Sequence, residues 1–336
     1  MRAATSDSGG GEHQMKAIVR DTYGSADVLR LAAIETPIAG QNEVLVRVRA
    51  AGVDQGVWHL MAGMPYVMRL AGFGVRAPKN RLLGYDVAGH VEAVGAGVTA
   101  FRPGDEVFGT CRGSFAEFAT ARADRLAPKP SNISFEQAAV VPISGYAALQ
   151  AVRDHGGVAA GRRVLIIGAS GGVGTFAVQI AKADGAEVTG ICSTAKAEFV
   201  RSMGADHVID YTREDFADGR NRYDVILDIA GNRPLSQLRR ALTRRGTLVI
   251  VGAEDAGNWL GIRRQLRAAA LSPFVRQDLG FFISKERSQD LEELRKLLET
   301  GAIRPVVDRI FPLDEVPTAI RYLRDGRARG KLVITN

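Results

Sequence analysis

The stretch RVLIIGASGGVGTFAVQIA, residues 163–181, constrains the fold more than any other part of the chain. An apolar run leads into a glycine-rich turn, and apolar side chains then recur with the 3.6-residue period of a helix. Further apolar runs alternate with helical patterns as far as about residue 250. Strands that alternate with helices form a parallel sheet covered on both faces, so the sequence predicts a doubly wound α/β domain.

The glycine-rich turn also predicts a phosphate site. Ala169, Gly171 and Gly174 take the three positions of a GxGxxG-type fingerprint between strand and helix. Backbone amides approach a pyrophosphate closely where side chains are absent, and the helix N-terminus adds partial positive charge. A tight turn without a ligand is the alternative, but the following βα units favour a dinucleotide. The residues expected to bind it at the strand ends are Gly168, Ala169, Gly171, Gly172, Val173, Gly174, Gly231, Val251 and Gly252.

The end of the next apolar run, ICSTAK, bears on which dinucleotide binds. NAD sites usually carry Asp or Glu about 20 residues after the fingerprint, where it holds the ribose diol. This chain has Ser193, Thr194 and Lys196 there. Hydroxyls and a cation suit the 2′-phosphate of NADP, which a carboxylate would repel. We therefore expect NADP(H) rather than NAD(H). The alternative is that Ser193 and Thr194 only cap the next helix.

The residues before this domain have a different pattern. From Met15 to about Arg125, short alternating runs are broken by Gly and Pro, which is typical of a mixed or antiparallel β domain with tight turns. Residues 1–14 are polar and Gly-rich, so we expect a disordered tail and neither a signal peptide nor a membrane anchor. No run reaches the roughly 20 apolar residues of a spanning helix.

Composition narrows the function classes. The 336 residues include 44 Lys and Arg against 37 Asp and Glu. The excess is spread along the chain, which suits an anionic cofactor and does not indicate nucleic acid. The Arg-rich segment 261–277 is expected to be a helix with a solvated basic face, with an acidic partner or a membrane as the alternative. Two cysteines, Cys111 and Cys192, exclude a disulfide framework and indicate a reducing compartment, the cytoplasm.

The order of motifs from Met15 to Asn336 resembles the medium-chain dehydrogenase/reductase superfamily, and within it the zinc-independent quinone oxidoreductase and enoyl reductase branch. The motifs are MKAIV, VLVRVRAAGV, LLGYDVAGHVEAVGAGV, FRPGDEVFG, GSFAEFA, PISGYAAL, GASGGVG, MGADHVIDY and GKLVI. The resemblance implies a mostly-β, GroES-like catalytic domain over 15–138 and 301–336, with a Rossmann domain over 139–300 inserted between its parts. It also implies a cofactor in the cleft between the domains, with Tyr211 near the adenosine phosphate. Ser144 matches a region that often contacts the nicotinamide; the alternative is a helix-start residue that packs the domain junction.

Zinc-dependent members of that superfamily differ from this chain at their metal ligands. Those ligands fall where this chain has Asp54, Tyr85, Asp86 and Val140, and of four cysteines for a second zinc only Cys111 is present. Zinc takes three or four nitrogen or sulfur donors, so we expect no metal. Alcohol oxidation without a Lewis acid is disfavoured. Reduction of a quinone or an activated alkene remains feasible, because the product oxygen needs only hydrogen-bond donors and a proton.

Asp54 and His59, in the stretch AGVDQGVWH, are the catalytic candidates. The resemblance places them where quinone oxidoreductases commonly have Asn and Tyr facing the nicotinamide. An imidazole that titrates near neutrality suits a proton donor or an oxyanion donor. We therefore expect His59 to take that role and Asp54 to orient substrate or cofactor. The alternative is that Asp54 caps a helix and His59 only packs beside Trp58.

The segment after these residues predicts the acceptor class. Its apolar, adaptable side chains suit a pocket for a small hydrophobic carbonyl or quinone, although core packing explains them nearly as well; they are Trp58, Met61, Met64, Tyr66, Met68 and Phe73. The sequence thus predicts an NADPH-dependent, zinc-independent reductase of quinones or α,β-unsaturated carbonyl compounds. A zinc-free alcohol or carbonyl dehydrogenase and a non-catalytic NADPH-binding regulator are the alternatives. By family analogy we expect a homodimer joined through the edge of the Rossmann sheet.

Overall fold

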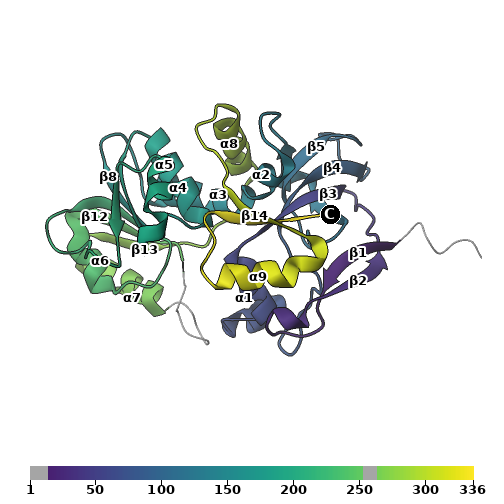
Figure 1. The fold of residues 1–336 in the computed structure, drawn as a ribbon, viewed down its shortest axis with the longest axis horizontal. Coiled ribbons are helices and arrows are strands. Elements are labelled where there is room, and N and C mark those ends of the chain that lie inside the picture. Colours follow the sequence, from purple (N-terminus) through teal and green to yellow (C-terminus); the bar gives the residue numbers. More distant parts are fainter. Residues whose placement is uncertain (1–13, 253–262) are drawn as a thin grey trace, which may run out of the picture.

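The structure is a computed structural model that describes residues 14–252 and 263–336. The tail predicted over residues 1–14 lies outside the described residues except for Gln14, which is the first residue of strand β1. Two large sheets lie toward opposite ends of the molecule, with helices between and around them (Figure 1). None of the helices in the described ranges combines the length and the apolar composition that a membrane crossing demands.

One sheet has six parallel strands in the order β10-β9-β8-β11-β12-β13. These are β8 (Arg163–Ile167), β9 (Glu187–Cys192), β10 (His207–Asp210), β11 (Tyr223–Asp228), β12 (Leu242–Ile250) and β13 (Asp278–Phe281). In β8 every residue after Arg163 is buried, as expected for a strand covered on both faces. Helices α4 (Gly172–Ala183), α5 (Ala197–Ser202), α6 (Leu235–Ala241) and α7 (Arg263–Leu271) pack around this sheet. The predicted doubly wound domain is confirmed.

The other sheet has the strand order β14-β15-β3-β4-β5-β7, and β6 also pairs with β3. Its strands are β3 (Glu43–Val53), β4 (Asp86–Val94), β5 (Glu106–Thr110), β6 (Phe118–Arg122), β7 (Leu126–Pro128), β14 (Val307–Pro312) and β15 (Lys331–Thr335). Strands β1 (Gln14–Val19) and β2 (Arg30–Glu35) form a separate antiparallel pair. Because β15 runs antiparallel to β3, the C-terminal residues lie in the sheet built by the N-terminal part of the chain.

Short helices connect the two sheets. Helix α2 (Phe135–Ala139) begins with a capping box between Ser134 and Gln137 and packs against β3 and β4. Helix α3 (Pro142–Leu149) starts with its proline in the first turn and packs against α4 and α8 (Ser288–Glu299). One buried cluster joins residues of both sheets through these helices. Helices α1 (Gln55–Ala62) and α9 (Val316–Arg324), with the short helical segments η1 (Ala26–Val28), η2 (Arg69–Phe73), η3 (Ala123–Arg125), η4 (Gln150–His155), η5 (Thr194–Lys196), η6 (Ser272–Phe274) and η7 (Leu313–Glu315), complete the fold.

Two sequence-based expectations about secondary structure are wrong. The pattern of PLSQLRRALTRRG, residues 234–246, predicts a single helix, but α6 ends at Ala241 and Leu242 already pairs with Tyr223 of β11. In the Arg-rich segment 261–277, residues 261 and 262 lie outside the described residues and α7 ends at Leu271. A short 3₁₀ turn containing Pro273 follows, and strand β13, which the sequence analysis did not foresee, then closes the sheet.

Candidate active site

The strand order of the parallel sheet reverses between β8 and β11, and doubly wound sheets have their ligand crevice at such a reversal. From β8 the chain runs outward through β9 and β10, then crosses back to continue from β11 to β13 on the other side. The connections after β8 and β11 therefore diverge at their carboxyl ends. Ligands of doubly wound sheets bind at this reversal. The glycine-rich turn predicted to bind phosphate lies directly after β8, at this place.

Glycines shape the turn after β8. Gly168 has a positive φ of 86°, and helix α4 starts after Gly171, its N-cap residue. A side chain on Gly174 would overlap the carbonyl oxygen of Gly168, so the first turn of α4 lies tight against the strand end. The first amides of a helix have no partner within it, and here they face the crevice. Ala169 is buried in the core, and Val173 is half-buried.

The neighbouring strand ends supply the remaining glycines of the predicted site. A side chain on Gly168 would come within 3.1 Å of the Ala230 nitrogen, which shows how closely the ends of β8 and β11 approach each other. Gly231 has a φ of 72° and donates its amide to Asp228 at 3.1 Å. Gly252, after Val251 at the end of β12, leaves no room for a side chain beside the Ile229 carbonyl. The structure thus brings the predicted backbone positions together along one edge.

The polar residues after β9 form a second group at the same edge. The Ser193 side chain makes no capping hydrogen bond, whereas the Thr194 hydroxyl donates to Asp210 at the end of β10. Lys196 donates to the carbonyls of Gly326 at 3.1 Å and Ala328 at 2.7 Å. The Tyr211 ring is half exposed, and the Arg233 guanidinium lies 5.4 Å from its centre. Hydroxyls, cations and an aromatic face therefore surround the place expected for the adenosine end.

A buried charge cluster that sequence reasoning missed lies under the phosphate turn. The Lys331 ammonium of β15 is 3.2 Å from Asp86 and 3.6 Å from Asp54, and all three side chains are largely or fully buried. Asp86 also accepts the amide of Ile143 in α3 at 2.8 Å. The Lys331 stem packs against the turn, since a side chain on Gly172 would stand 2.7 Å from its Cδ. The cluster therefore links β3, β4, β15 and α3 to the phosphate turn.

Burial dominates the electrostatics of this cluster. It raises the pKa of Asp86 to about 6, because the attraction of Lys331 and the Ile143 amide only partly offset the loss of solvent and the charge of Asp54. Burial alone would lower the pKa of Lys331, but the charges of Asp86 and Asp54 outweigh it and the pKa is raised. One ammonium therefore serves two carboxylates. Lys331 therefore stays charged, and Asp86 takes up a proton in mildly acidic solution.

Asp54 and His59 both lie at helix α1. Asp54 is the N-cap residue and accepts the Val57 amide at 3.2 Å, besides facing Lys331. The His59 ring lies edge-on to Trp58, with the ring centres 4.9 Å apart, and its Nδ1 is 3.1 Å from the Met64 carbonyl. Burial lowers the pKa of His59, against the Met64 hydrogen bond. In the neutral ring Nδ1–H donates to Met64, which leaves Nε2 free to accept.

The other predicted contact residues divide into two groups. Ser144 is buried, and its Oγ lies beside Gly172, within 3.3 Å of where a side chain on that glycine would begin. Met61 is buried in the core, so core packing explains it. Large apolar side chains from 66 to 75 are instead partly or mostly exposed; they are Tyr66, Val67, Leu70, Phe73 and Val75. The segment that follows His59 therefore presents an apolar surface.

The donors near α1 do not fit zinc. Across the described residues, no three His, Cys, Asp or Glu side chains come together as a metal-binding group. The carboxylates of Asp54 and Asp86 already face the Lys331 ammonium, and Val140 has no donor atom. Cys111 is buried near Asp86, and burial raises the pKa of its thiol, which disfavours the thiolate that zinc would bind.

Comparison with known proteins assigns the family. Residues 40–131 match the family model described as alcohol dehydrogenase GroES-like domain, and residues 203–334 match the one described as zinc-binding dehydrogenase. The chain is 32% identical to a 2-methylene-furan-3-one reductase of Solanum lycopersicum, an alignment that covers 99% of this chain and 82% of the relative. The chain is a medium-chain dehydrogenase/reductase. The resemblance in motif order, from MKAIV to GKLVI, is thereby confirmed.

Two further similar proteins support this assignment, one by sequence and one by structure. An NADPH-dependent alkenal/one oxidoreductase, chloroplastic, of Arabidopsis thaliana is 32% identical over 96% of this chain and 79% of the relative. The quinone oxidoreductase structure from Coxiella burnetii superposes with a TM-score of 0.84 at 29% identity, covering 96% and 99% of the two chains. This medium-chain dehydrogenase/reductase is therefore an oxidoreductase of the nicotinamide-dependent class.

Proposed function

We propose that the protein is an NADPH-dependent reductase that transfers a hydride to hydrophobic quinones or α,β-unsaturated carbonyl compounds without zinc. The observation that carries this proposal is the Lys331 ammonium between Asp54 and Asp86. Those two carboxylates stand where zinc-dependent members hold their metal, and here a lysine satisfies their charge. A site without a Lewis acid favours reduction of an activated alkene or quinone over oxidation of an alcohol.

The phosphorylated dinucleotide is supported by the residues after β9. No carboxylate directly follows Cys192, where an NAD enzyme would hold the ribose diol. Ser193 offers a hydroxyl that makes no helix-capping bond, and Lys196 and Arg233 bring positive charge to the same edge. A phosphate dianion gains from cations and donors, which the ribose of NAD does not need. We assign Ser193, Thr194 and Lys196 to the 2′-phosphate, with Tyr211 beside it.

The residues of α1 supply the groups that the reduction needs. When bound, the reduced dinucleotide supplies the hydride. Ser144 and the turn after β8 hold it beside the cluster of Asp54, Asp86 and Lys331. After hydride addition, an enolate or hydroquinone oxygen needs a donor and a proton. We assign that role to Nε2 of His59 in its protonated form, while Nδ1–H remains bound to Met64. Asp54 fixes the start of α1 and so positions the ring.

The acceptor class is supported by the apolar surface from Tyr66 to Val75, directly after His59 in the chain. Such a surface suits a hydrophobic acceptor. Relatives named as a furanone reductase, an alkenal/one oxidoreductase and a quinone oxidoreductase support the same class. The two buried free cysteines are in keeping with the reducing cytoplasm as the working compartment.

The decisive experiment follows NADPH absorbance with a panel of quinones, enones and aldehydes. We expect consumption with quinones or enones, little with aldehydes, and no loss after treatment with a chelator. Preferential turnover of aldehydes or alcohols would indicate a carbonyl dehydrogenase. Tight NADPH binding without any turnover would indicate a regulatory protein instead. Stoichiometric zinc in active protein, with activity lost to the chelator and restored by the metal, would overturn the metal-free mechanism.

We also propose a homodimer joined through strand β13. This strand is at the edge of the parallel sheet, and two apolar side chains that flank it are strongly exposed, Phe274 at 85% and Ile283 at 82%. An uncovered edge beside apolar residues is a pairing surface. We expect Ile283→Lys to shift the mass measured by light scattering from dimer to monomer, whereas Ile38→Lys, at an equally exposed position on the loop after β2, leaves it unchanged. A monomeric wild-type protein would refute the dimer.

A further inference from the structure

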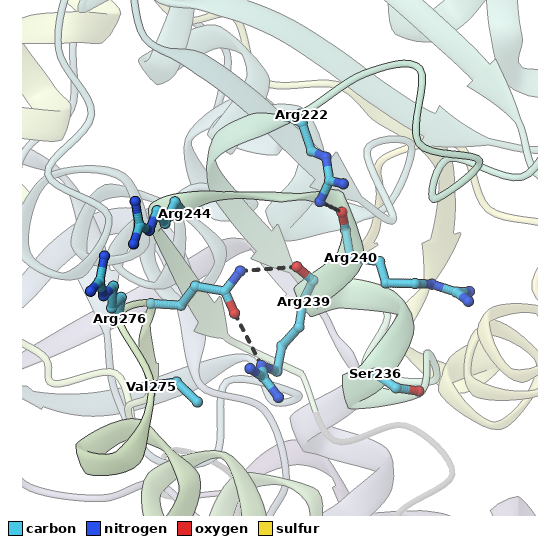
Figure 2. A pocket seen from close by; sticks show the side chains of 8 residues that line it. Arg222, Ser236, Arg239, Arg240, Arg244, Val275 and Arg276 are labelled. Carbon is cyan, nitrogen blue, oxygen red and sulfur yellow. Dashed lines mark hydrogen bonds between the residues drawn. The ribbon is translucent and has the colours of Figure 1, made fainter.

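Five arginines line a depression at the amino-terminal edge of the parallel sheet (Figure 2). Its volume is about 550 Å³, and its lining includes Arg222, Arg239, Arg240, Arg244, Arg276 and Gln277. The first of these directly precedes β11, and the last two directly precede β13. The dinucleotide turn follows the carboxyl end of β8. The depression and the cofactor crevice therefore lie at opposite edges of one sheet.

The guanidinium groups of this depression make no close ion pair within the described part of the protein, although the charge of Arg240 acts on Asp215. None of its five arginines has a carboxylate within ion-pair distance among residues 14–252 and 263–336. Some arginines elsewhere have two acidic partners: Arg153 contacts both Asp184 and Glu293, and Arg295 contacts both Glu292 and Glu299. Like charges held together repel one another, and a multivalent anion would relieve that repulsion.

Part of the lining is held in position for a ligand. The Oε1 atom of Gln277 accepts the Nε–H of Arg239 at 3.0 Å, and its Nε2 donates to the Arg239 carbonyl at 3.0 Å. Two of the dashed lines in Figure 2 end on Arg239 and mark these hydrogen bonds. The terminal nitrogens of Arg239 stay available for a ligand. Arg222 is likewise held, because it donates to the carbonyls of Arg240 and Leu242. An ordered guanidinium loses less entropy on binding than a free one.

The lining chemistry points to phosphate groups. Guanidinium forks match phosphate oxygens with two parallel hydrogen bonds. Val275 is the one apolar side chain among the described lining residues, and no aromatic ring is present on which a base would stack. A cavity of this size suits a small molecule. We propose that the depression binds a compact anion carrying two or more phosphate groups, as a second anion site separate from the cofactor crevice.

The test titrates inorganic tripolyphosphate into the full-length protein saturated with NADP⁺, so that the cofactor crevice is occupied. Calorimetry near physiological ionic strength should show one saturable site per chain. We expect Arg239→Gln/Arg276→Gln to weaken this binding at least tenfold and to leave NADPH turnover unchanged. Arg49→Gln removes an exposed arginine from β3, in the other sheet, and is the matched control with wild-type binding.

Several outcomes would overturn the proposal. These are the absence of saturable binding in the wild type, equal weakening by Arg49→Gln, and unchanged binding in the double variant. Light scattering on the double variant tests whether the arginines instead form a contact between subunits. If the wild type binds no anion and the variant dissociates, the arginines contact a second subunit and the anion site does not exist. If the double variant fails to fold, the single variant Arg244→Gln replaces it, because Arg244 is exposed in β12. This variant should weaken tripolyphosphate binding at least threefold. Unchanged binding in Arg244→Gln also refutes the site.

Discussion

Replacing Lys331 with Met removes the ammonium and keeps most of the stem that packs against Gly172. Asp86 and Asp54 then face each other without a cation, after losing partners at 3.2 and 3.6 Å. At an effective dielectric constant of about 20, each lost attraction amounts to about 5 kcal/mol before compensation. Breaking a buried ion pair on one side typically costs about 3–5 kcal/mol. We expect the free energy of unfolding of Lys331→Met to fall by about that amount at pH 8.

The pH dependence distinguishes this cause from a general packing defect. The pKa of Asp86 in the folded protein, about 6, lies above the ordinary value of 3.8, so the folded state holds a proton that the unfolded state has released. The contribution of Asp86 to stability therefore falls as pH rises from about 4 to 6. The loss of the Lys331 charge raises the pKa of Asp86 further, so the deficit of the variant grows above pH 6 and shrinks below it.

Urea unfolding followed by circular dichroism at pH 8 and pH 5.5 measures this deficit. Lys129→Met is the matched control, because Lys129 is also buried but pairs at 3.1 Å with Glu106, which is half exposed. Its deficit should be smaller and nearly independent of pH. Adding Asp86→Asn to Lys331→Met should restore at least half of the loss at pH 8. A Lys331→Met deficit below about 1 kcal/mol at pH 8, or one of equal size at both pH values, would refute the reasoning.

Three further predictions concern the crevice and the reaction. Gly174→Val should abolish NADPH binding in a fluorescence titration, because the valine side chain would overlap the Gly168 carbonyl. Gly280→Ala is the control and should bind NADPH normally, because the added methyl group meets no atom closer than 4.0 Å. Wild-type affinity in Gly174→Val would contradict the placement of the turn. Lys196→Met should raise the KM for NADPH about tenfold and leave that for NADH nearly unchanged; equal changes for both would remove Lys196 from the 2′-phosphate site. His59→Phe should lower kcat with enones about 100-fold. Because burial lowers the pKa of His59 from 6.5, kcat of the wild type should fall as pH rises through that lowered value, and an unchanged variant or a flat profile would rule out His59 as donor.

Local signals were sufficient for the parallel sheet and the phosphate turn. The buried run of β8, the glycines after it and the helical period of α4 lie next to one another in the chain, so their combined meaning is visible without the structure. Strand β13 escaped detection because DLGF has only four residues and contains a glycine. The end of α6 was misplaced because LTRRG has no period that separates a helix from the start of a strand.

The charge cluster could not be predicted because its partners are distant in the sequence. Lys331 and Asp86 are separated by 245 positions, and no local pattern connects them. One signal was available, since a lysine opens the otherwise apolar strand KLVIT, and a charged residue inside a buried strand needs a partner. The helix-capping role of Asp54 was foreseen as an alternative from its place before α1, but its contact with Lys331 was not.

The position of β15 in the first sheet has a consequence for the order in which the protein matures during synthesis. Strand β3 leaves the ribosome early, yet its neighbour in the sheet follows only after the whole nucleotide domain has been made. Until residue 331 has emerged, Asp54 and Asp86 lack the Lys331 counter-ion. In a chain truncated before that residue, burial of these two carboxylates is unfavourable. Burial of Asp54 and Asp86 in the first sheet therefore depends on the synthesis of Lys331.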